Sequence, residues 1–329
     1  MKARYALLAA VAAGSAALVS ATAAVRSASS GGDAFTGLWT AQPTEPAARA
    51  RESFLQLTLR RRAGAHGDSN HSQRVRLADL KGLASEQVNA GAAAVSFTLE
   101  RDAGTFAFDG SFRRGQGAGH FTFAPRPEFV AALRGLGYGG LDDEKVYSMA
   151  VLDVSRGFVR ELDALGYSRL DLDDLMSLRI HGATPAFIRE LKALGYDHLA
   201  VDDLVSLRIH GATPEFVREM QSLADGRLSA ADLVSLRIHG ATPDFVRQLR
   251  QLGYDRMGAD DLVSMRIHGV SPDFIRELKG LGYDHVRVDD LVSMRIHGVN
   301  PEFVRRVQAR RGSVSVDRLV GMRIHGQEP

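Results

Sequence analysis

A strict period of 29 residues constrains this chain more than any other feature of its sequence. The tetrapeptide Arg-Ile-His-Gly occurs six times, and a phenylalanine recurs with the same spacing. The phenylalanines are Phe158, Phe187, Phe216, Phe245, Phe274 and Phe303. A fixed period of this length predicts a repeat array, in which each unit buries its apolar face against its neighbours. Such arrays usually present extended binding surfaces, so the period also bears on function.

Each unit is expected to hold two short helices, as residues 185–213 illustrate. Thr184 precedes a proline, and this pair is typical of a helix start: the hydroxyl caps the free N–H groups and proline has no N–H to satisfy. Gly195 fits the left-handed residue that ends a helix. A second helix is expected from Asp202-Asp203, whose charges suit the positive end of its dipole, to Gly211.

Both helices have apolar residues that are expected to form the core. In the first helix these are Phe187, Ile188, Leu191 and Leu194. In the second they are Leu204, Val205, Leu207 and Ile209, which we interpret as one broad buried face. Helices this short are marginal alone in water, so stacking of units must supply the stability. The sequence predicts an α-solenoid of seven two-helix repeats over residues 127–329, with an atypical first and last unit.

Residues 34–125 alternate between polar and apolar side chains, which is typical of half-buried antiparallel strands. The pattern predicts a β-meander of five or six strands, with a short helical turn near 85–89 and a polar loop over 62–73. Gly115, Gly117 and Gly119 are interpreted as hairpin-turn glycines. The apolar face of the sheet must be covered, and we expect it to pack on the first repeat. The predicted fold class is therefore α+β.

The amino terminus indicates export. Lys2 and Arg4 precede an apolar run over residues 5–19, and Ala21-Thr22-Ala23 fits a cleavage site. We interpret residues 1–24 as a signal peptide; an uncleaved anchor is the alternative. The chain has no cysteine, which excludes a lipoprotein anchor, disulfides and thiol catalysis. The predicted location is the periplasm, with no stable membrane span after cleavage. A formal net charge of +2 predicts no nucleic-acid partner.

The repeated histidines are the most conspicuous candidates for a site. They are His181, His210, His239, His268, His297 and His325. Successive copies should lie on the order of 10 Å apart, which is too far for two imidazoles to share one metal ion. We favour a structural role, in which each imidazole meets the free carbonyl groups at a helix end. A pH-sensitive array and a metal ladder are the alternatives.

The arginine two residues before each histidine is also interpreted as structural. These residues are Arg179, Arg208, Arg237, Arg266, Arg295 and Arg323. We expect a packed stem whose guanidinium bonds a carboxylate or carbonyl of a neighbouring unit. Asp202 and Asp203 are possible partners. They also resemble a paired-carboxylate site, but four units repeat the pair, and an active site is rarely copied so often.

One position in the turn between the two helices stays basic or titratable while its neighbours vary. It is occupied by Arg169, His198, Arg227, Arg256 and His285. A solvated basic row is one interpretation. The other is a stripe that binds an acidic partner.

The sequence indicates no enzyme and no cofactor or metal site. Residues 135–140 fit a dinucleotide-binding pattern by letter, but they lie between two predicted helices with no preceding strand. The chain has no Gly-x-Ser-x-Gly motif and no phosphate-binding loop.

The repeat motif, Leu-Val-Ser-Met-Arg-Ile-His-Gly-Val followed by Asn/Ser/Thr-Pro-Glu/Asp-Phe, resembles helical repeats of uncharacterised exported bacterial proteins. Similar repeats are appended to membrane metallopeptidases that sense antibiotics. The glycine-rich segment through Phe121-Thr122-Phe123 is similar to the amino-terminal part of the same group. The resemblance implies an exported repeat protein. It carries no peptidase activity to this chain, which lacks the His-Glu-x-x-His metal motif.

Three functions follow from these patterns. The first is a non-catalytic exported scaffold that binds another envelope protein through its repeats. The second is an envelope sensor whose β domain (residues 34–125) binds a small ligand and whose repeats dock a signalling partner. An enzyme is the third. Because the repeated tetrapeptide is so regular, we interpret it as the link between units and expect any working surface along the basic row or where the copies differ.

Overall fold

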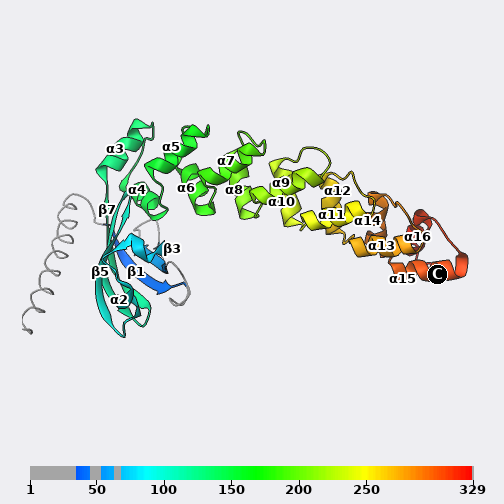
Figure 1. Ribbon diagram of the computed structural model, residues 1–329, viewed down its shortest axis with the longest axis horizontal. Coiled ribbons are helices and arrows are strands. Elements are labelled where there is room, and N and C mark those ends of the chain that lie inside the picture. Colours follow the sequence, from blue (N-terminus) through cyan, green and yellow to red (C-terminus); the bar gives the residue numbers. More distant parts are fainter. Residues whose placement is uncertain (1–34, 45–52, 63–67, 328–329) are drawn as a thin grey trace, which may run out of the picture. The chain divides into compact units, whose positions relative to one another are not determined.

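The computed structural model describes residues 35–44, 53–62 and 68–327, so the predicted signal peptide lies outside the described residues. The fold is α+β: a curled antiparallel sheet is followed by regularly repeated helix pairs (Figure 1). The chain divides into two compact units, of which the first ends at Arg179 and the second begins at Ile180. In the part of the chain described, no helix is long and apolar enough to cross a bilayer.

The sheet has seven antiparallel strands in the order β3-β2-β1-β7-β6-β5-β4. The strands are β1 (Phe35–Pro43), β2 (Phe54–Arg62), β3 (Asp68–Arg76), β4 (Leu80–Lys81), β5 (Ala93–Arg101), β6 (Gly104–Arg113) and β7 (Gln116–Pro125). The first and last long strands are neighbours, with Trp39 opposite Gly119. This pairing joins two antiparallel halves into one sheet with edge strands β3 and β4, and it was not predicted, because alternation within each strand does not specify which strands pair.

Three details of the predicted sheet are wrong. It has seven strands rather than five or six. Much of the expected polar loop over 62–73 belongs to β3, an edge strand paired with β2. Gly117 and Gly119 lie within β7, and only Gly115 is in the turn, with a φ of +83°. Gly117 and Gly119 make room for the Trp39 ring: a Cβ on Gly119 would lie 2.8 Å from its Nε1. The expected helical turn near Ser85 is present as α2 (Ser85–Asn89).

Aromatic side chains fill the inner side of the sheet. Trp39 donates from Nε1 to the Asp109 carbonyl, 3.2 Å away, and packs edge-on to Phe97. Phe97 stacks on Phe108 with ring centroids 4.7 Å apart. The cluster continues onto Tyr147 of α4 (Asp143–Val151), which stacks on Phe35. The sheet therefore packs on the first helical repeat, as expected.

The helices follow the predicted 29-residue plan. The first helices of the units are α3 (Pro127–Gly135), α5 (Arg156–Ala164), α7 (Pro185–Ala193), α9 (Pro214–Leu223), α11 (Pro243–Gln251), α13 (Pro272–Gly280) and α15 (Pro301–Arg311). The second helices are α4, α6 (Leu172–His181), α8 (Val201–Ile209), α10 (Ala230–Ile238), α12 (Ala259–Ile267), α14 (Val288–Ile296) and α16 (Val316–Ile324). A side-chain oxygen caps most first helices; Thr184, for example, accepts from the Phe187 N–H.

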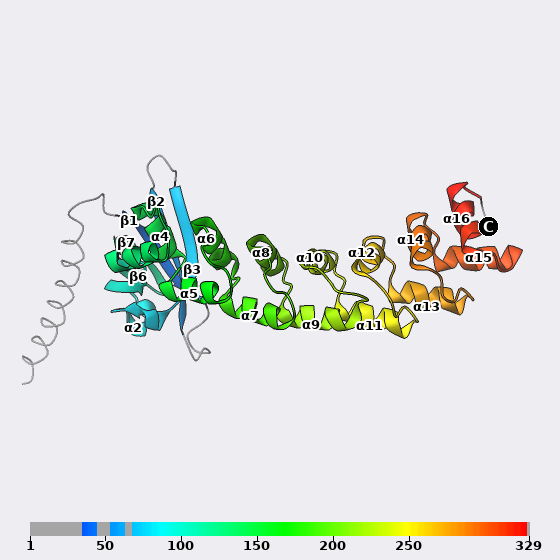
Figure 2. The same ribbon diagram turned by 90° about the horizontal axis from the view of Figure 1, so that it is seen from above.

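In the second compact unit the helices form two layers. The second helices α8, α10, α12, α14 and α16 lie side by side, and the first helices α7 to α15 form a row along one side of them (Figure 2). Between the layers lie buried residues such as Phe216, Val217 and Leu233. Because every unit repeats the same path, all the second helices run in the same direction.

Candidate functional site

The repeated arginines join consecutive units. The Arg237 guanidinium lies over the ring of Phe216, 5.0 Å from its centroid, and its Nε donates to the His210 carbonyl of the preceding unit at 3.3 Å. Arg266 repeats both contacts with Phe245 and the His239 carbonyl. Arg323 donates to the Gly298 carbonyl at 2.7 Å. The arginine therefore caps the end of the preceding second helix, and its partners there are carbonyls rather than the aspartates offered by the sequence.

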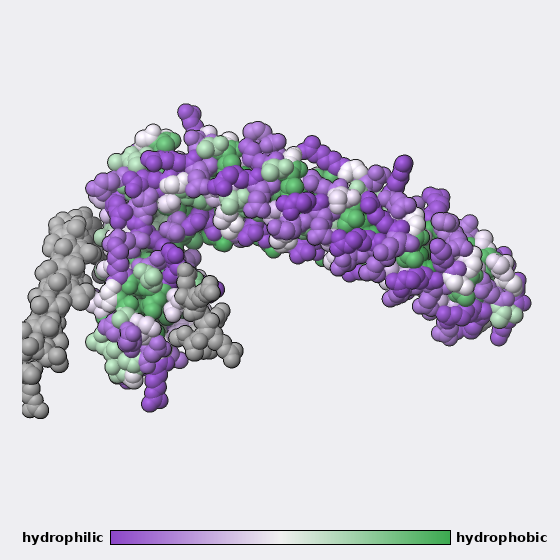
Figure 3. Space-filling model, in the orientation of Figure 1, coloured by the Kyte–Doolittle hydropathy of each residue, from purple (hydrophilic) through white to green (hydrophobic). Residues whose placement is uncertain are grey.

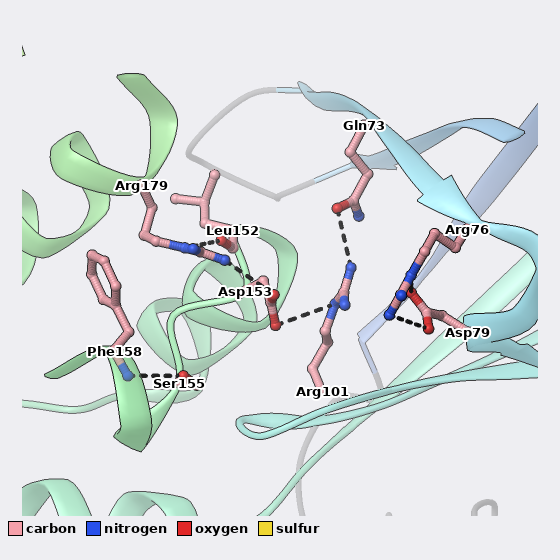
Figure 4. A network of polar contacts seen from close by, with 9 residues as sticks. All are labelled: Gln73, Arg76, Asp79, Arg101, Leu152, Asp153, Ser155, Phe158 and Arg179. Atoms are coloured by element: carbon pink, nitrogen blue, oxygen red, sulfur yellow. Dashed lines mark hydrogen bonds and ion pairs between the residues drawn. The ribbon is translucent and has the colours of Figure 1, made fainter. Parts of the chain in front are cut away.

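The first compact unit shows a variant of this contact. Asp153, with a φ of +56°, occupies the position that glycine holds in later units. Its carboxylate accepts from Arg179 at 3.0 Å and faces Nε of Arg101, on β5, at 3.6 Å (Figure 4). Arg179 also donates to the Leu152 carbonyl at 3.1 Å. The same device that links repeats therefore also links the sheet to the first repeats.

A second polar contact fixes the sheet to the start of α5. Asp102, in the turn after β5, accepts from the backbone N–H of Arg156 at 2.7 Å and from its guanidinium at 2.6 Å. The Arg156 guanidinium lowers the pKa of the Asp102 carboxyl. A third contact joins the sheet to α4: Arg61 of β2 lies over the rings of Phe35 and Tyr147 and pairs with Glu144. Burial raises the pKa of Tyr147 to about 12.

The expected contact of each repeated imidazole with the free carbonyl groups at its helix end stays a prediction. Each of the six is exposed. His210, His239, His268, His297 and His325 are the residues that end the second helices. For His210 and His239, the carbonyl group at the helix end accepts from an arginine of the next unit. The repeated tetrapeptide thus separates into an arginine that links units and a histidine that faces solvent.

Sequence reasoning missed a row of exposed isoleucines between those two residues. It comprises Ile180, Ile209, Ile238, Ile267, Ile296 and Ile324, and we call it the isoleucine row. Each isoleucine is between 55% and 60% exposed, although Ile209 was expected in the core. These six are most of the large exposed apolar residues among those described, and all belong to the second compact unit. Six exposed isoleucines at one repeated position differ from the scattered single apolar residues that are normal on protein surfaces.

Helix geometry explains why the isoleucines point outward. Successive residues of an α-helix lie about 100° apart, so Ile209 is about 140° from Leu204 and about 160° from Leu207. Leu204 and Leu207 are fully buried, and Ile209 therefore faces the opposite side. Val205, four residues earlier, is partly exposed on that side. A helical wheel of the sequence would have shown the row; counting apolar residues did not.

Charged residues border the isoleucine row on both sides. At the amino-terminal ends of the second helices, Asp202, Asp260, Asp289 and Asp317 are exposed, and we call them the acidic rim. Asp202 precedes Ile209 by seven residues, which places both on the same side of α8. At the carboxyl-terminal ends, the exposed histidines and the repeated arginines form the basic rim. In the view of Figure 3, hydrophobic residues appear as separate patches in a mostly hydrophilic surface.

The predicted basic row has local structural reasons to exist. All five residues are exposed, and Arg169, His198 and His285 have φ values of 54–56° in the left-handed region. Arg227 donates to the Gly195 carbonyl of the preceding unit at 2.6 Å. A Cβ on Gly253 would lie 3.4 Å from the His285 ring. Part of this row therefore covers the end of the preceding first helix, and its function as a binding stripe stays a prediction.

The outer side of the sheet is hollowed. An open cavity of about 680 Å³ lies over β7, β1, β2 and β3. Leu38, which is exposed, lies there beside Arg60 and His120.

On the inner side of β3, burial lowers the pKa of His71.

The described residues include no group of three or more His, Asp or Glu side chains placed to hold a metal ion. Comparison of the chain with known protein families, curated proteins and solved structures finds no match.

Proposed function

We propose that this protein is a non-catalytic exported scaffold that binds another protein through its helical repeat array. The isoleucine row is the observation that carries this proposal. Six identical apolar side chains lie at one position of six successive helices, with each isoleucine more than half exposed to solvent. Burial of apolar surface is the main driving force of protein association.

Comparison of the copies within the chain supports a role in binding. An exposed or half-buried position of the first helix has diverged among the units and reads Lys192, Gln221, Arg250, Lys279 and Gln308. The isoleucine position has not diverged, although isoleucine is solvated there and contributes little to the core. A polar residue would serve the solubility of the chain better at this position, so association is the better explanation for an apolar side chain.

Capture from cell envelopes tests the proposal. The tagged protein is compared with a variant in which Ile209, Ile238 and Ile267 are replaced by lysine. The matched control has lysine at Ala193, Ser222 and Gln251, which are exposed residues 29 apart on the first helices. We expect the wild-type chain and the control to retain the same partner, whether another envelope protein or an untagged copy of this chain, and the isoleucine variant to lose it. Equal retention by all three chains would contradict a function of the isoleucine row.

A second candidate, the envelope sensor, is favoured by the hollow over Leu38. An exposed leucine next to an arginine and a histidine suits a small amphipathic anion. Replacing Leu38 by aspartate should then abolish the rise in melting temperature that a fatty-acid-like probe such as decanoate causes. An unchanged melting temperature of the wild-type chain with this probe would count against the candidate.

A further inference from the structure

We propose that the isoleucine row binds a second copy of this chain, so that two arrays pack face to face. The inference rests on the proposed function, because it names the partner of the same surface. It begins from the open side of the second helices, since the first helices cover their other side (Figure 2).

The two rims make this surface self-complementary. Asp202, Val205 and Ile209 follow one another along the outer side of α8, from the acidic rim to the basic rim. A second copy turned about an axis along the array presents the same helices in the opposite direction. Its basic rim then lies opposite the acidic rim of the first copy, and its Val205 lies opposite Ile209. Basic and acidic residues thus meet at both edges of the interface, and each isoleucine row packs on valines of the other copy.

The repeat spacing favours a second copy over an unrelated partner. An extended surface with one apolar side chain per unit needs a partner whose apolar groups recur at the same interval. Another array of this chain has the same 29-residue repeat, so every isoleucine from α8 to α16 in one copy meets a valine of the same repeated position on the other copy. A contact between equivalent surfaces of two copies is also the commonest way in which soluble proteins associate.

The size of the surface is sufficient for a stable dimer. In the second compact unit, α8, α10, α12, α14 and α16 together carry 16 exposed residues, and the five exposed histidines that follow these helices bring the number to 21. This number is at the lower end of the range of about 20–30 residues a side found in stable interfaces.

The acidic rim disfavours a membrane as the partner. Surfaces that bind anionic bilayers combine apolar side chains with lysine and arginine. Here Asp202, Asp260 and Asp289 lie on the same side of the helices as the isoleucines. Anionic lipid would repel this rim, whereas a second copy of the chain neutralises it.

Sedimentation equilibrium of the full chain tests the pairing. We expect a dimer for the wild-type chain and a dissociation constant raised more than about a hundredfold when Ile209, Ile238 and Ile267 are replaced by lysine. The control with lysine at Ala193, Ser222 and Gln251 should dimerise within about twofold of the wild type. Melting curves followed by circular dichroism show that each chain is folded.

A complementation experiment separates the pairing from general damage. One variant carries Asp202→Lys, Asp260→Lys and Asp289→Lys; the other carries His210→Asp, His268→Asp and His297→Asp. Each should be a monomer alone, because the introduced lysines face the basic rim of the other copy and the introduced aspartates face its acidic rim. Mixed together they should form a one-to-one heterodimer. At one edge of the interface the introduced lysines face the introduced aspartates, and at the other edge the native histidines face the native aspartates.

Three results would overturn the inference: a monomeric wild-type chain, a dimer that withstands the isoleucine substitutions, or charge variants that do not associate on mixing. A monomer that sediments with anionic phosphatidylglycerol vesicles through the same isoleucines would assign the row to a membrane. A monomer that still captures an envelope protein through the isoleucine row would leave the proposed function standing and remove only this partner.

Discussion

The hydroxyl of Tyr196 donates to the carbonyl of Leu228 in the next unit, 2.7 Å away. Tyr254 and Tyr283 make the same contact with Val286 and Val314. The intervening unit lacks the tyrosine, and there the backbone N–H of Asp225 donates to the Met257 carbonyl at 2.9 Å. In each of these contacts a backbone carbonyl accepts a hydrogen bond from the repeat before it. The donor is a tyrosine hydroxyl in three cases and a backbone N–H in the fourth.

Removal of one such hydroxyl should weaken the array. Tyr254→Phe leaves the Val286 carbonyl without this donor, so we expect the free energy of unfolding to fall by about 1–2 kcal/mol. Chemical denaturation followed by circular dichroism measures the change. Tyr196→Phe should cost a similar amount, and the two losses should add because the sites are far apart in sequence and share no partner. A change below about 0.3 kcal/mol for both would show that the tyrosines do not link the units.

The glycine of the tetrapeptide should be required for stability, because of its left-handed backbone and because an arginine of the next repeat lies close to it. Gly240 has a φ of +69°, and a Cβ there would lie 3.2 Å from Nη2 of Arg266. We expect Gly240→Ala to reduce the free energy of unfolding by about 1–3 kcal/mol. Gly280, at the end of α13, has open space around it and no left-handed φ. Gly280→Ala should raise the free energy of unfolding by up to about 1 kcal/mol, and a loss of similar size at both sites would contradict this account.

Substitution of the glycines in β7 should destabilise the protein as much as substitution of the repeat glycines does. A Cβ on Gly119 would lie 2.0 Å from the Asp109 carbonyl oxygen, so we expect Gly119→Ala to cost about 3 kcal/mol or more. The chain has a single tryptophan, Trp39, whose fluorescence reports on the sheet directly. Gly135→Ala, where a Cβ meets nothing within 4 Å, is the control and should leave the tryptophan signal unchanged.

The contact between Asp102 and Arg156 should make stability depend on pH in the acidic range. The hydrogen bond from Arg156 lowers the folded-state pKa of Asp102. The contribution of this carboxylate to the free energy of unfolding is therefore present above the unfolded-state pKa of about 3.9, and it is lost as pH falls through the lower folded-state pKa. Asp102→Asn should therefore lower the melting temperature at pH 7, and the gap between wild type and variant should close below about pH 4. A gap that is constant from pH 7 to pH 3 would exclude this ion pair as its cause.

The period predicted most of the helical fold. Thr184 with Pro185 and the glycines Gly195 and Gly211 specify where helices begin and end, because caps and left-handed residues act locally. The edge strand β3 was missed because its inner side carries polar residues, including His71 and Gln73 opposite Leu59 and Leu57. At an edge, hydrogen bonding to one neighbour suffices, and alternation in the strand's own sequence is weak.

The candidate surface was hidden by the same regularity that revealed the array. Arg237 and Ile238 are adjacent and equally repeated, yet one contacts the preceding unit and the other faces solvent. Repetition alone cannot separate a residue that links units from one that lies beside it. Only the direction of each side chain relative to Leu233 and Leu236, both fully buried, makes the distinction.

Thiol labelling in intact envelopes tests most directly whether the isoleucine row is covered by protein. The chain has no cysteine, so Ile238→Cys and, as a control, Gln251→Cys each introduce a unique thiol on an exposed position. We expect a maleimide to label Ile238→Cys at least about tenfold more slowly than Gln251→Cys in envelopes, and both at similar rates in dilute purified protein. Equal labelling rates in envelopes would show that the row is open to solvent and would contradict its function as a binding surface.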